Sequence, residues 1–446
     1  MNNENKNSRR EFVKQTAIIT SGAMALPLLS KANFFSGADD IIKIALIGCG
    51  GRGTGAAMQA LLTKQNVKLV AMADAFRDRV DSCFKSLTAD DLSESTGTPG
   101  NSIKKKIDVP EERKYTGFDA YKKAIAHADV VILTTPPGFR PIHFEEAIKQ
   151  SKHVFMEKPV AVDPAGVKKV LDAAETAKQK KLNVVVGLQR HYQNSYRELF
   201  KRKEMIGDIV AAQAWWNNDG VWVNPRKNNQ TEMEYQMRNW YYFNWLCGDH
   251  ILEQHIHNID VVNWFKGGYP VKAQGMGGRQ VRNGKDHGEI FDHHYVEFHY
   301  EDGSILNSQC RHIPGTMSKV DELLIGTKGN IYCDPANITD KKGKVLFQFD
   351  KKTENNPYQT EHDELFEAIA KKEFKFSDAE NGAKSSMTAI MGRMATYSGV
   401  VLEWNKLLAS GISIMPKEYA WDAPPPVLPG SDGYYPIAKP GVTKYV

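Results

Sequence analysis

The chain has 446 residues, of which 41% are hydrophobic and 25% charged, the balance of an ordinary globular protein of two or three domains. Lys and Arg number 58 against 53 for Asp and Glu, so the formal net charge of +5 is too small to indicate a phosphate-tracking surface. The short basic runs at 104–106 and 178–181 are interpreted as solvated faces. We therefore expect no nucleic-acid partner.

The N-terminus has the layout of an export signal. Residues 8–14 read S-R-R-E-F-V-K and precede an uncharged stretch at 15–30. This pattern resembles the bacterial twin-arginine signal. The stretch is too short for a membrane span, which needs roughly 20 apolar residues. No cysteine for a lipid anchor lies near the expected cleavage points after Ala32 or Ala38. We expect residues 1–38 to be a signal segment and the mature protein to be periplasmic without a membrane anchor. A frayed amphipathic helix is the alternative.

Cysteine and histidine spacings give little support for a metal. The five cysteines have no C-x-x-C spacing, and their odd number makes disulfides optional. His250, His255 and His257 are an alternative set of zinc ligands, but their spacing is not diagnostic. We expect no metal site.

A strand, a glycine-rich turn and a helix follow one another after the signal segment. Residues 41–47 form a nearly continuous apolar run, typical of a strand buried in a parallel sheet. This run leads into G-x-G-x-x-G at 48–53, and apolar residues at helical spacing follow. A second strand at 67–73 ends at Asp74, about twenty residues beyond the last glycine. The pattern predicts a dinucleotide site, and a merely tight turn is the alternative.

Each part of this pattern has a physical role. Glycines let backbone N–H groups approach a pyrophosphate, and the acid accepts hydrogen bonds from the ribose hydroxyls. An aspartate repels a 2′-phosphate, so NAD is favoured over NADP, although Arg77 and Arg79 stand nearby. The residues expected to contact the cofactor here are Gly48, Cys49, Gly50, Gly51, Arg52, Gly53 and Asp74.

Strands and helices continue to alternate up to about residue 187. The polar stretch 81–115 is interpreted as an inserted surface loop with one or two helical turns. Beyond it we expect helices at 121–126 and 142–150 and strands at 129–134, 153–156 and 183–187. This alternation is typical of a doubly wound α/β domain, whose ligand site lies at the C-terminal ends of its strands.

Several motifs resemble the Gfo/Idh/MocA family, named for glucose–fructose oxidoreductase and inositol dehydrogenase. The first are Thr135-Pro136-Pro137, His143 and Glu157-Lys158-Pro159 after a strand. Residues 247–260 resemble the family pattern G-G-x-x-x-D-x-x-x-H-x-x-D, with Glu253 in place of its aspartate and Asp249 in place of its second glycine. The resemblance covers about residues 40–410. It implies an N-terminal Rossmann dinucleotide-binding domain at 39–188, and it adds to the cofactor site Thr135, Pro136, His143, Glu157 and Lys158.

The stretch 247–260 also indicates chemistry by itself. If it is one helix, Glu253 and His257 share a face with Asp260, and charged groups on an otherwise apolar helix must pair or face a cleft. The family implies that Lys158 contacts the nicotinamide and the substrate hydroxyl. We expect His257 to be the general base, Lys158 its electrostatic partner, and Glu253 the group that orients the imidazole or the sugar. A structural His–Glu pair and a charged strand end at Lys158 are the alternatives.

The second domain, 189–422, is expected to be an open, mostly antiparallel sheet covered by helices. We expect strands at 209–216, 271–275, 294–300, 304–310, 320–326 and 329–333, and helices at 360–370 and 378–404. The family commonly uses this sheet for assembly, so a homo-oligomer, either dimer or tetramer, is expected. Residues 423–446 are rich in proline and are interpreted as an extended tail.

Aromatic residues between 215 and 245 are interleaved with amide and acid groups, as a sugar site requires. An aromatic core is the alternative. We expect a small-molecule carbohydrate substrate, and the residues expected to bind it are Arg190, His191, Trp222, Trp240 and Asp249.

Three functions are compatible with these features. The leading one is an NAD-dependent oxidoreductase that acts on a sugar ring hydroxyl and keeps its cofactor, because little free NAD is expected outside the cytoplasm. The second is a redox-neutral glycoside hydrolase. It oxidises the sugar, eliminates the glycosidic substituent, adds water and then returns the hydride to the sugar. It needs a further base, for which His191, Tyr192 and His250 are unranked candidates. The third is a sugar- or nucleotide-binding protein without catalysis.

Overall fold

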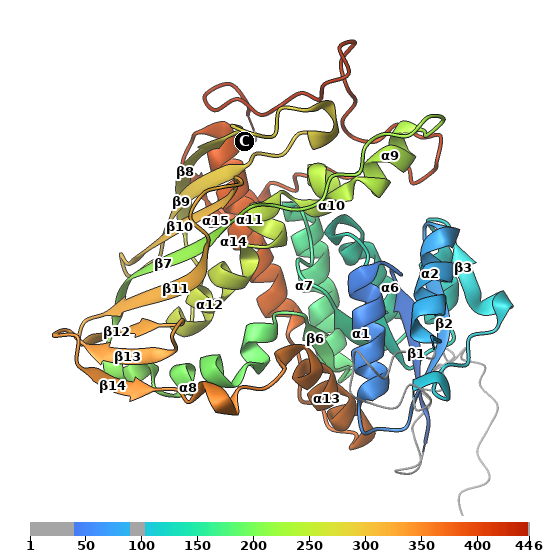
Figure 1. The fold of residues 1–446 in the computed structure, drawn as a ribbon, viewed down its shortest axis with the longest axis horizontal. Helices are drawn as coiled ribbons and strands as arrows, with labels where there is room; N and C mark the ends of the chain where they lie inside the picture. Colours follow the sequence, from blue (N-terminus) through green and yellow to red (C-terminus); the bar gives the residue numbers. More distant parts are fainter. Residues whose placement is uncertain (1–39, 90–102, 445–446) are drawn as a thin grey trace, which may run out of the picture. The chain divides into compact units, whose positions relative to one another are not determined.

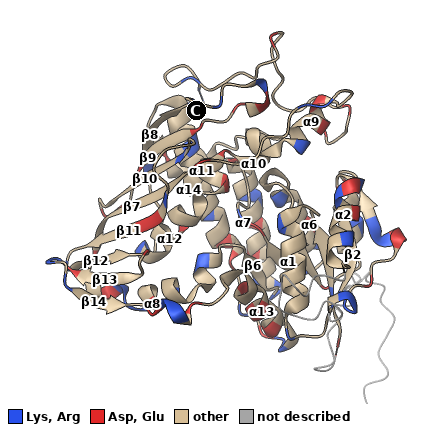
Figure 2. Ribbon diagram, in the orientation of Figure 1, with Lys and Arg blue, Asp and Glu red and all other residues tan. Residues whose placement is uncertain are grey.

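The computed structural model describes residues 40–89 and 103–444. The expected export signal at 1–38 lies outside the described residues. Within the two described ranges, every helix is too short or too polar to cross a membrane. Lys and Arg are interspersed with Asp and Glu over the ribbon (Figure 2), which agrees with the small net charge.

The first part of the chain forms a six-stranded parallel sheet (Figure 1). Its strands are β1 (Ile42–Ile47), β2 (Val67–Asp74), β3 (Lys114–Thr116), β4 (Val130–Leu133), β5 (His153–Met156) and β6 (Val184–Val186). Their order is β3-β2-β1-β4-β5-β6, so the chain reverses direction across the sheet between β1 and β4. The intervening helices are α1 (Gly51–Leu62), α2 (Arg77–Leu87), α5 (Ala120–Ile125), α6 (Arg140–Lys149) and α7 (Pro164–Gln179). The predicted doubly wound domain is confirmed.

Two glycines allow the turn between β1 and α1. Gly48 has a φ of +98°, and a Cβ on it would lie 2.5 Å from the backbone nitrogen of Thr135. A Cβ on Gly53 would lie 1.9 Å from the carbonyl oxygen of Gly48. Any larger residue at either position would push α1 away from the ends of β1 and β4.

The second part forms a nine-stranded sheet in the order β14-β13-β12-β11-β7-β10-β9-β8-β15. Its strands are β7 (Ile209–Asn218), β8 (Lys272–Gly278), β9 (His293–His299), β10 (Ile305–His312), β11 (Lys319–Gly326), β12 (Gly329–Tyr332), β13 (Asn337–Asp340), β14 (Val345–Gln348) and β15 (Leu402–Glu403). β7 and β10 pair in parallel, and the other neighbours pair antiparallel. The mostly antiparallel sheet is therefore confirmed.

Helices cover one face of this sheet and join it to the parallel sheet. α12 (Ile256–Lys266) packs on β7 and β11, and α14 (Ala379–Ser398) contacts both β8 and α7. One hydrophobic cluster accordingly runs from Ala45 of β1 to Phe298 of β9. Smaller helices complete this part: α8 (Asn194–Lys201), α9 (Glu232–Arg238), α10 (Asn244–Cys247), α11 (His250–Glu253), α13 (Pro357–Ala370) and α15 (Trp404–Ala409).

Three expectations about helices and loops are wrong. The loop was expected to begin at residue 81, but α2 continues to Leu87, because the side chains of Val80, Cys83 and Leu87 are buried. Residues 90–102 of that loop lie outside the described residues. The single helix expected over 247–260 is divided, since α11 ends at Glu253 and α12 begins at Ile256. The helix expected over 378–404 ends at Ser398, because Gly399 takes a left-handed φ of +74°.

The C-terminal segment after α15 runs in extended form across both sheets' domains. The backbone N–H of Ile414 donates to Asp163, the residue that caps α7, at 2.8 Å. Trp421 packs on Phe118, which precedes α5, with ring centroids 4.6 Å apart. Further on, the carbonyl of Val427 accepts a 2.7 Å hydrogen bond from Gln236 of α9. This segment therefore ties the nucleotide-binding domain to the second domain.

Candidate functional site

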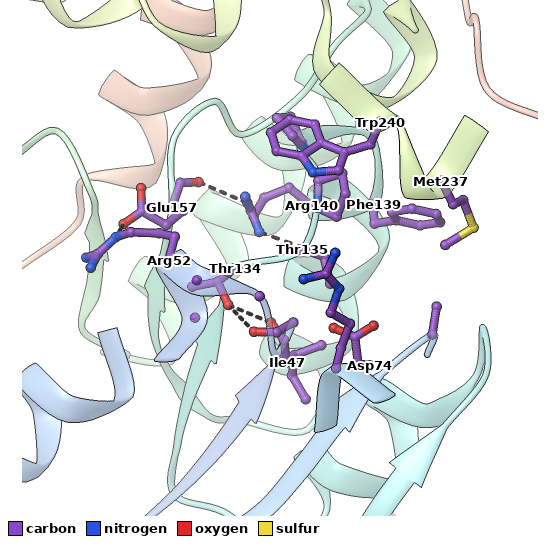
Figure 3. Close-up of a pocket in the computed structure, with 18 of the residues that line it drawn as sticks. Ile47, Arg52, Asp74, Thr134, Thr135, Phe139, Arg140, Glu157, Met237 and Trp240 are labelled. Carbon is purple, nitrogen blue, oxygen red and sulfur yellow. Dashed lines mark hydrogen bonds and ion pairs between the residues drawn. The ribbon is translucent and has the colours of Figure 1, made fainter. Parts of the chain in front are cut away.

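A cavity of about 720 Å³ lies where the carboxyl ends of the parallel strands meet the second domain (Figure 3). Gly48 after β1, Asp74 at the end of β2, Thr135 after β4 and Lys158 after β5 all line it. This edge is the reversal point of the strand order, where ligands bind in doubly wound folds. The volume lies within the range of small-molecule and cofactor sites.

The first turn of α1 suits a pyrophosphate. Gly50 precedes the helix and has no side chain to cap the first backbone N–H groups. A Cβ on Gly50 or Gly51 would meet nothing within 4 Å, so this stretch of backbone borders open space. Uncapped N–H donors beside open space at a helix N-terminus form a binding site for an anion. This part of the cavity therefore fits the pyrophosphate of a dinucleotide.

The structure does not bring Cys49 to the cavity. Its backbone N–H donates to Oδ2 of Asp74 at 2.7 Å, and its buried Sγ lies 3.5 Å from the carbonyl oxygen of Ala73. The expected contact of Cys49 with the cofactor is corrected accordingly, because its only backbone donor is already used. The other predicted glycine-loop residues, Gly48, Gly50, Gly51, Arg52 and Gly53, line the cavity.

Asp74 marks one end of the cavity, and the Arg52–Glu157 pair marks the other (Figure 3). The carboxylate of Asp74 accepts from the backbone N–H groups of Cys49 and Phe76, at 2.7 and 3.0 Å. Burial raises the pKa of Asp74, and these hydrogen bonds oppose the rise. Each carboxylate oxygen keeps a lone pair, so the group remains able to accept hydrogen bonds from a ribose.

Arg140 organises the segment between β4 and β5, a role the sequence did not indicate. Its Nε donates to the carbonyl oxygen of Glu157 at 2.9 Å, and its Nη1 lies 3.4 Å from Oγ1 of Thr135. The same Oγ1 lies 3.2 Å from Nδ1 of His143. Burial lowers the pKa of His143 to about 3, with Arg140 lowering it further, so this imidazole is neutral. Thr135, Pro136, His143 and Glu157 all line the cavity as expected.

Lys158 and Glu253 meet inside the cavity although they come from different domains. The Nζ of Lys158 donates to the backbone oxygen of Glu253 at 2.5 Å and lies 3.2 Å from its Oε1. The two side chains are only 12% and 14% exposed. Burial raises the pKa of Glu253, and the ammonium of Lys158 opposes the rise. The ammonium of Lys158 is therefore held in a fixed position at the wall of the cavity and is mostly shielded from water.

His257 is a buried, neutral imidazole on the same wall. The residue is 8% exposed, and its ring stacks on Trp216 with centroids 6.1 Å apart. Burial lowers the pKa of His257 well below its usual value, and the charges of Lys158 and Arg190 lower it further. Among the described residues, its Nδ1 has no hydrogen-bond partner. A neutral imidazole beside a cavity is able to accept a proton.

The second domain supplies an aromatic wall. Trp222 and Trp240 line the cavity as expected, and their rings meet edge to face with centroids 5.9 Å apart. Trp216, Asn224 and Met237 line it as well, and Figure 3 shows Trp240 and Met237 on the side away from β1. The aromatic segment is thus divided, since Tyr235, Phe243 and Trp245 belong to a buried core cluster instead.

Arg190 and His191 do not reach the cavity, which corrects two expected substrate contacts. The guanidinium of Arg190 forms a buried ion pair with Glu322 of β11. The Nε2 of His191 lies 2.7 Å from Oδ2 of Asp260, and its ring stacks on Trp264. Arg190 therefore ties its segment to β11, and His191 ties the same segment to α12. Asp260 therefore faces His191, and not Glu253 as expected for a single helix.

Asp249 is also corrected, because it is fully buried and its carboxylate is saturated. It accepts from the backbone N–H of His250 at 2.5 Å, from the N–H of Phe291 at 2.9 Å and from the hydroxyl of Tyr397 at 2.5 Å. Burial alone would raise the pKa of Asp249, but His294 and His250 hold it well below its usual range. A substrate cannot reach this group. Its role is to fix the start of α11.

Two of the further bases considered for a hydrolase, His250 and Tyr192, are also buried. His250 is 0% exposed, and the hydroxyl of Tyr192 donates to Asp378 at 2.8 Å. In the described part of the chain, Asp249, His250 and His294 bring metal-capable atoms within 4.8 Å of one another. However, Nη1 of Arg282 lies 3.4 Å from Nδ1 of His250, and a fixed positive charge there disfavours a metal cation.

Several cavity residues were not predicted as site residues. Gln254 lies between Glu253 and His257, and Tyr358 comes from α13. Arg238 of α9 forms a two-point pair with Asp78 of α2 at 2.7 and 2.8 Å, and it covers the ring of Phe76 at 3.7 Å. A contact of this kind depends on two segments far apart in sequence, so spacing alone gives no signal for it.

Comparison with known proteins gives a family match over the nucleotide-binding part of the chain. Residues 42–187 match the family model GFO_IDH_MocA, an oxidoreductase family with an NAD-binding Rossmann fold. An inositol 2-dehydrogenase of Gluconacetobacter diazotrophicus is 29% identical over 35% of this chain and 41% of its own length. A 2,7-anhydro-N-acetylneuraminate hydratase of Escherichia coli is 24% identical over 46% of this chain and 51% of its own length. The chain spans about half the length of the curated relatives it matches.

A solved structure extends the likeness in fold. The scyllo-inositol dehydrogenase of Lactobacillus casei, determined with NAD(H) and scyllo-inositol, superposes with a TM-score of 0.60. It is 18% identical, and the match covers 82% of this chain and all of that one. Both domains therefore share that architecture. The nucleotide-binding part of this chain, residues 42–187, is thus similar in sequence to the NAD-binding Gfo/Idh/MocA oxidoreductases.

Proposed function

We propose that this protein is an NAD-dependent oxidoreductase that acts on a ring hydroxyl of a carbohydrate and keeps its cofactor bound between turnovers. The observation that carries the proposal is one cavity lined by the glycine-rich turn, Lys158, Glu253 and His257. Hydride transfer requires a dinucleotide site and a proton acceptor in the same enclosed space, and this cavity has both.

The chain's residues fit NAD along the length of the cavity. The uncapped first turn of α1 at Gly50 and Gly51 would hold the pyrophosphate, and Asp74 would accept the adenosine ribose hydroxyls. When bound, NAD supplies a hydride acceptor. Arg79 also lines the cavity near Asp74, but the carboxylate at the end of β2 favours a ribose with a free 2′-hydroxyl.

Lys158 and His257 divide the work on the substrate hydroxyl. The ammonium of Lys158 stabilises negative charge on the hydroxyl oxygen, which lowers the pKa of that hydroxyl. The neutral ring of His257 accepts the proton as the carbon–hydrogen bond breaks. Glu253 holds Lys158 in place through its backbone oxygen and its carboxylate. General acid–base catalysis of this kind contributes ~10²–10⁴-fold.

The aromatic wall supports a carbohydrate substrate. Trp222 and Trp240 present apolar faces to the cavity, and Asn224 adds an amide group. Sugar rings combine apolar C–H faces with hydroxyls, so stacking and hydrogen bonding act together there. The names of the inositol dehydrogenase relatives point to the same class, polyhydroxylated rings.

Retention of the cofactor is supported by contacts that cross between the domains. Arg238 bridges to Asp78 and Phe76, and Trp421 of the C-terminal segment packs on Phe76 with centroids 5.0 Å apart. These contacts border the cavity near Asp74. The resemblance of the N-terminus to a twin-arginine signal supports a periplasmic location, where a retained cofactor would be an advantage.

The experiment is to purify the exported protein, denature it, and assay the released nucleotide. A second aliquot is incubated with a panel of glycosides and inositols, with and without added NAD, and the products are analysed. We expect copurified NAD(H) and an oxidised sugar formed together with a reduced acceptor sugar. Protein recovered empty, and active only with stoichiometric consumption of NAD, would refute the proposal.

A redox-neutral glycoside hydrolase is the second candidate, favoured by the similarity to a 2,7-anhydro-N-acetylneuraminate hydratase, an enzyme named for the addition of water. Oxidation would then acidify a neighbouring C–H bond before elimination, hydration and return of the hydride. The same panel separates the two, because a hydrolase releases free sugar from glycosides without any acceptor. A binding protein without catalysis would give no product at all.

Assembly is proposed to occur through the nine-stranded sheet. Helices cover one face, and on the other face β9 and β10 carry half-buried polar side chains such as Tyr295, Glu297 and Asn307. A second copy of the chain would cover this open face. Light scattering of the purified protein would give the number of copies.

A further inference from the structure

We propose that Gln254 is a substrate-orienting residue whose side-chain amide nitrogen donates a hydrogen bond into the cavity, to an oxygen beside the reacting carbon. The inference rests on the proposed oxidation of a ring hydroxyl and adds a requirement to it. The substrate must carry an acceptor oxygen, such as a second hydroxyl, next to the hydroxyl that His257 deprotonates.

The position of Gln254 follows from the break between α11 and α12. It lies after the last residue of α11, partly exposed, and lines the cavity beside Glu253 and His257. A continuous helix would point residues 253, 254 and 257 in directions set by its regular turn. All three residues line one cavity here.

Hydrogen bonds behind Gln254 determine which end of its amide faces the cavity. Nη2 of Arg282 lies 2.7 Å from Nδ1 of His312, and a guanidinium only donates. Nδ1 of His312 is therefore the acceptor, and the ring proton sits on Nε2. That Nε2 lies 3.0 Å from Oε1 of Gln254 and donates to it. Because His312 binds the amide oxygen of Gln254, the NH₂ group of the amide is the end that faces the cavity.

The supporting residues are held rigidly. The ring of His312 is 2% exposed and stacks between Tyr241 and His250, at centroid distances of 6.1 and 4.4 Å. Arg282 is 4% exposed, and its Nη1 donates to the carbonyl oxygen of Phe291. Burial lowers the pKa of His312 well below its usual value, so its neutral form persists. The orientation of Gln254 is thus fixed before a substrate arrives.

Gln254 adds a fixed hydrogen-bond donor to the site. Glu253 and His257 offer acceptors, whereas Lys158 is held by Glu253. Gln254 adds a neutral donor that binds hydroxyl and carbonyl oxygens alike, so it contacts the substrate and the oxidised product similarly. Such an interaction lowers KM with little effect on kcat.

The kinetic test compares Gln254→Leu, His312→Phe and the matched control Gln179→Leu, an exposed glutamine on α7 whose amide contacts Glu175. The probes are myo-inositol and methyl α-D-glucopyranoside, each assayed with a fixed, saturating concentration of an acceptor sugar to which the bound cofactor returns the hydride. We expect Gln254→Leu to raise KM about 10-fold and His312→Phe about 3-fold, with kcat and bound NAD(H) unchanged. Gln179→Leu should match the wild type. An unchanged KM for Gln254→Leu, or a loss in kcat alone, would overturn the proposal.

A second readout does not depend on turnover. Nitrogen-15 NMR of the holoenzyme, with His312 assigned from the His312→Phe spectrum, reports the tautomer of that ring at pH 7. We expect the proton on Nε2 and a bare Nδ1. A proton on Nδ1 or a doubly protonated ring would refute the orientation of Gln254. If the wild type oxidises no probe yet the tautomer is as expected, the proposed function fails and the orientation of the amide stands.

Discussion

The contact of Arg238 with Asp78 and Phe76 leads to a specific prediction about cofactor release. Arg238 belongs to the second domain, whereas Asp78 and Phe76 belong to the nucleotide-binding domain. Arg238 and Phe76 both line the cavity beside Asp74. Release of the adenosine end of NAD requires these two walls to separate. Arg238→Met removes the charge while keeping most of the side chain's length.

The magnitude follows from the exposure of the groups. Arg238 is 27% exposed and Asp78 61% exposed, so their ion pair contributes about 0.2–1 kcal/mol. The guanidinium lies 3.7 Å from the centroid of the Phe76 ring, which adds about 0.5–1 kcal/mol. Losing both, about 0.7–2 kcal/mol, should accelerate release of NAD roughly 3–30-fold.

The assay loads purified protein with NAD and follows its release after dilution into an excess of a fluorescent NAD analogue. Arg77→Met is the matched control, because Arg77 pairs with Asp81 and Glu111 inside the nucleotide-binding domain alone. Asp78→Asn distinguishes the bridge from a direct contact between Arg238 and the cofactor, since it breaks only the bridge. If Arg238→Met and Arg77→Met release NAD at the same rate, the reasoning is refuted.

The other predictions concern catalysis, cofactor content and pH. Lys158→Ala and His257→Ala should each lower turnover of a sugar probe by ~10²–10⁴-fold while the protein stays folded with NAD bound, and near-normal turnover in either would contradict the assigned roles. Asp74→Ala should lower the NAD content of the purified protein, measured after denaturation, and an unchanged content would argue against the ribose contact. Burial lowers the pKa of His255 to about 3, so the unfolded chain takes up a proton below pH ~6.5 that the folded chain refuses. Stability should therefore be lost as pH falls, by about 2 kcal/mol from this residue at pH 5, and denaturant titrations should show a shallower pH dependence in His255→Asn.

The nucleotide-binding domain could be predicted because its signals are local. Residues 41–74 contain a buried strand, the glycines of a tight turn and an acid after the next strand. The structure brings Gly48 and Asp74 to one cavity. The role of Lys158 was predicted from the resemblance of Glu157-Lys158-Pro159, which follows a strand, to the family motif. No comparable local pattern separates Trp222, which lines the cavity, from Trp245, which is 1% exposed in a core cluster.

The incorrect expectations have a shared cause, which is that a polar residue near a site motif can be structural. Arg190 and Asp249 were expected to bind substrate because they stand beside site motifs. The structure pairs Arg190 with Glu322, more than a hundred positions away, and surrounds Asp249 with donors from three segments. Burial of a charge demands a partner, and the partner's position in the sequence is not predictable from spacing.

The division of the expected helix at 247–260 explains how the catalytic group is assembled. In a continuous helix, the carbonyl oxygen of Glu253 would accept from the backbone N–H of His257. Here that N–H donates to the carbonyl of Gln254 at 3.3 Å, and the oxygen of Glu253 accepts from Nζ of Lys158 at 2.5 Å. A free carbonyl at a helix C-terminus attracts a cation, so the break itself creates the binding site for the ammonium. Gln254, which also lines the cavity, lies at the same break. A hydrophobic pattern that predicts a helix therefore gives the correct residues here, while their geometry depends on the interruption of the helical hydrogen-bond pattern between α11 and α12.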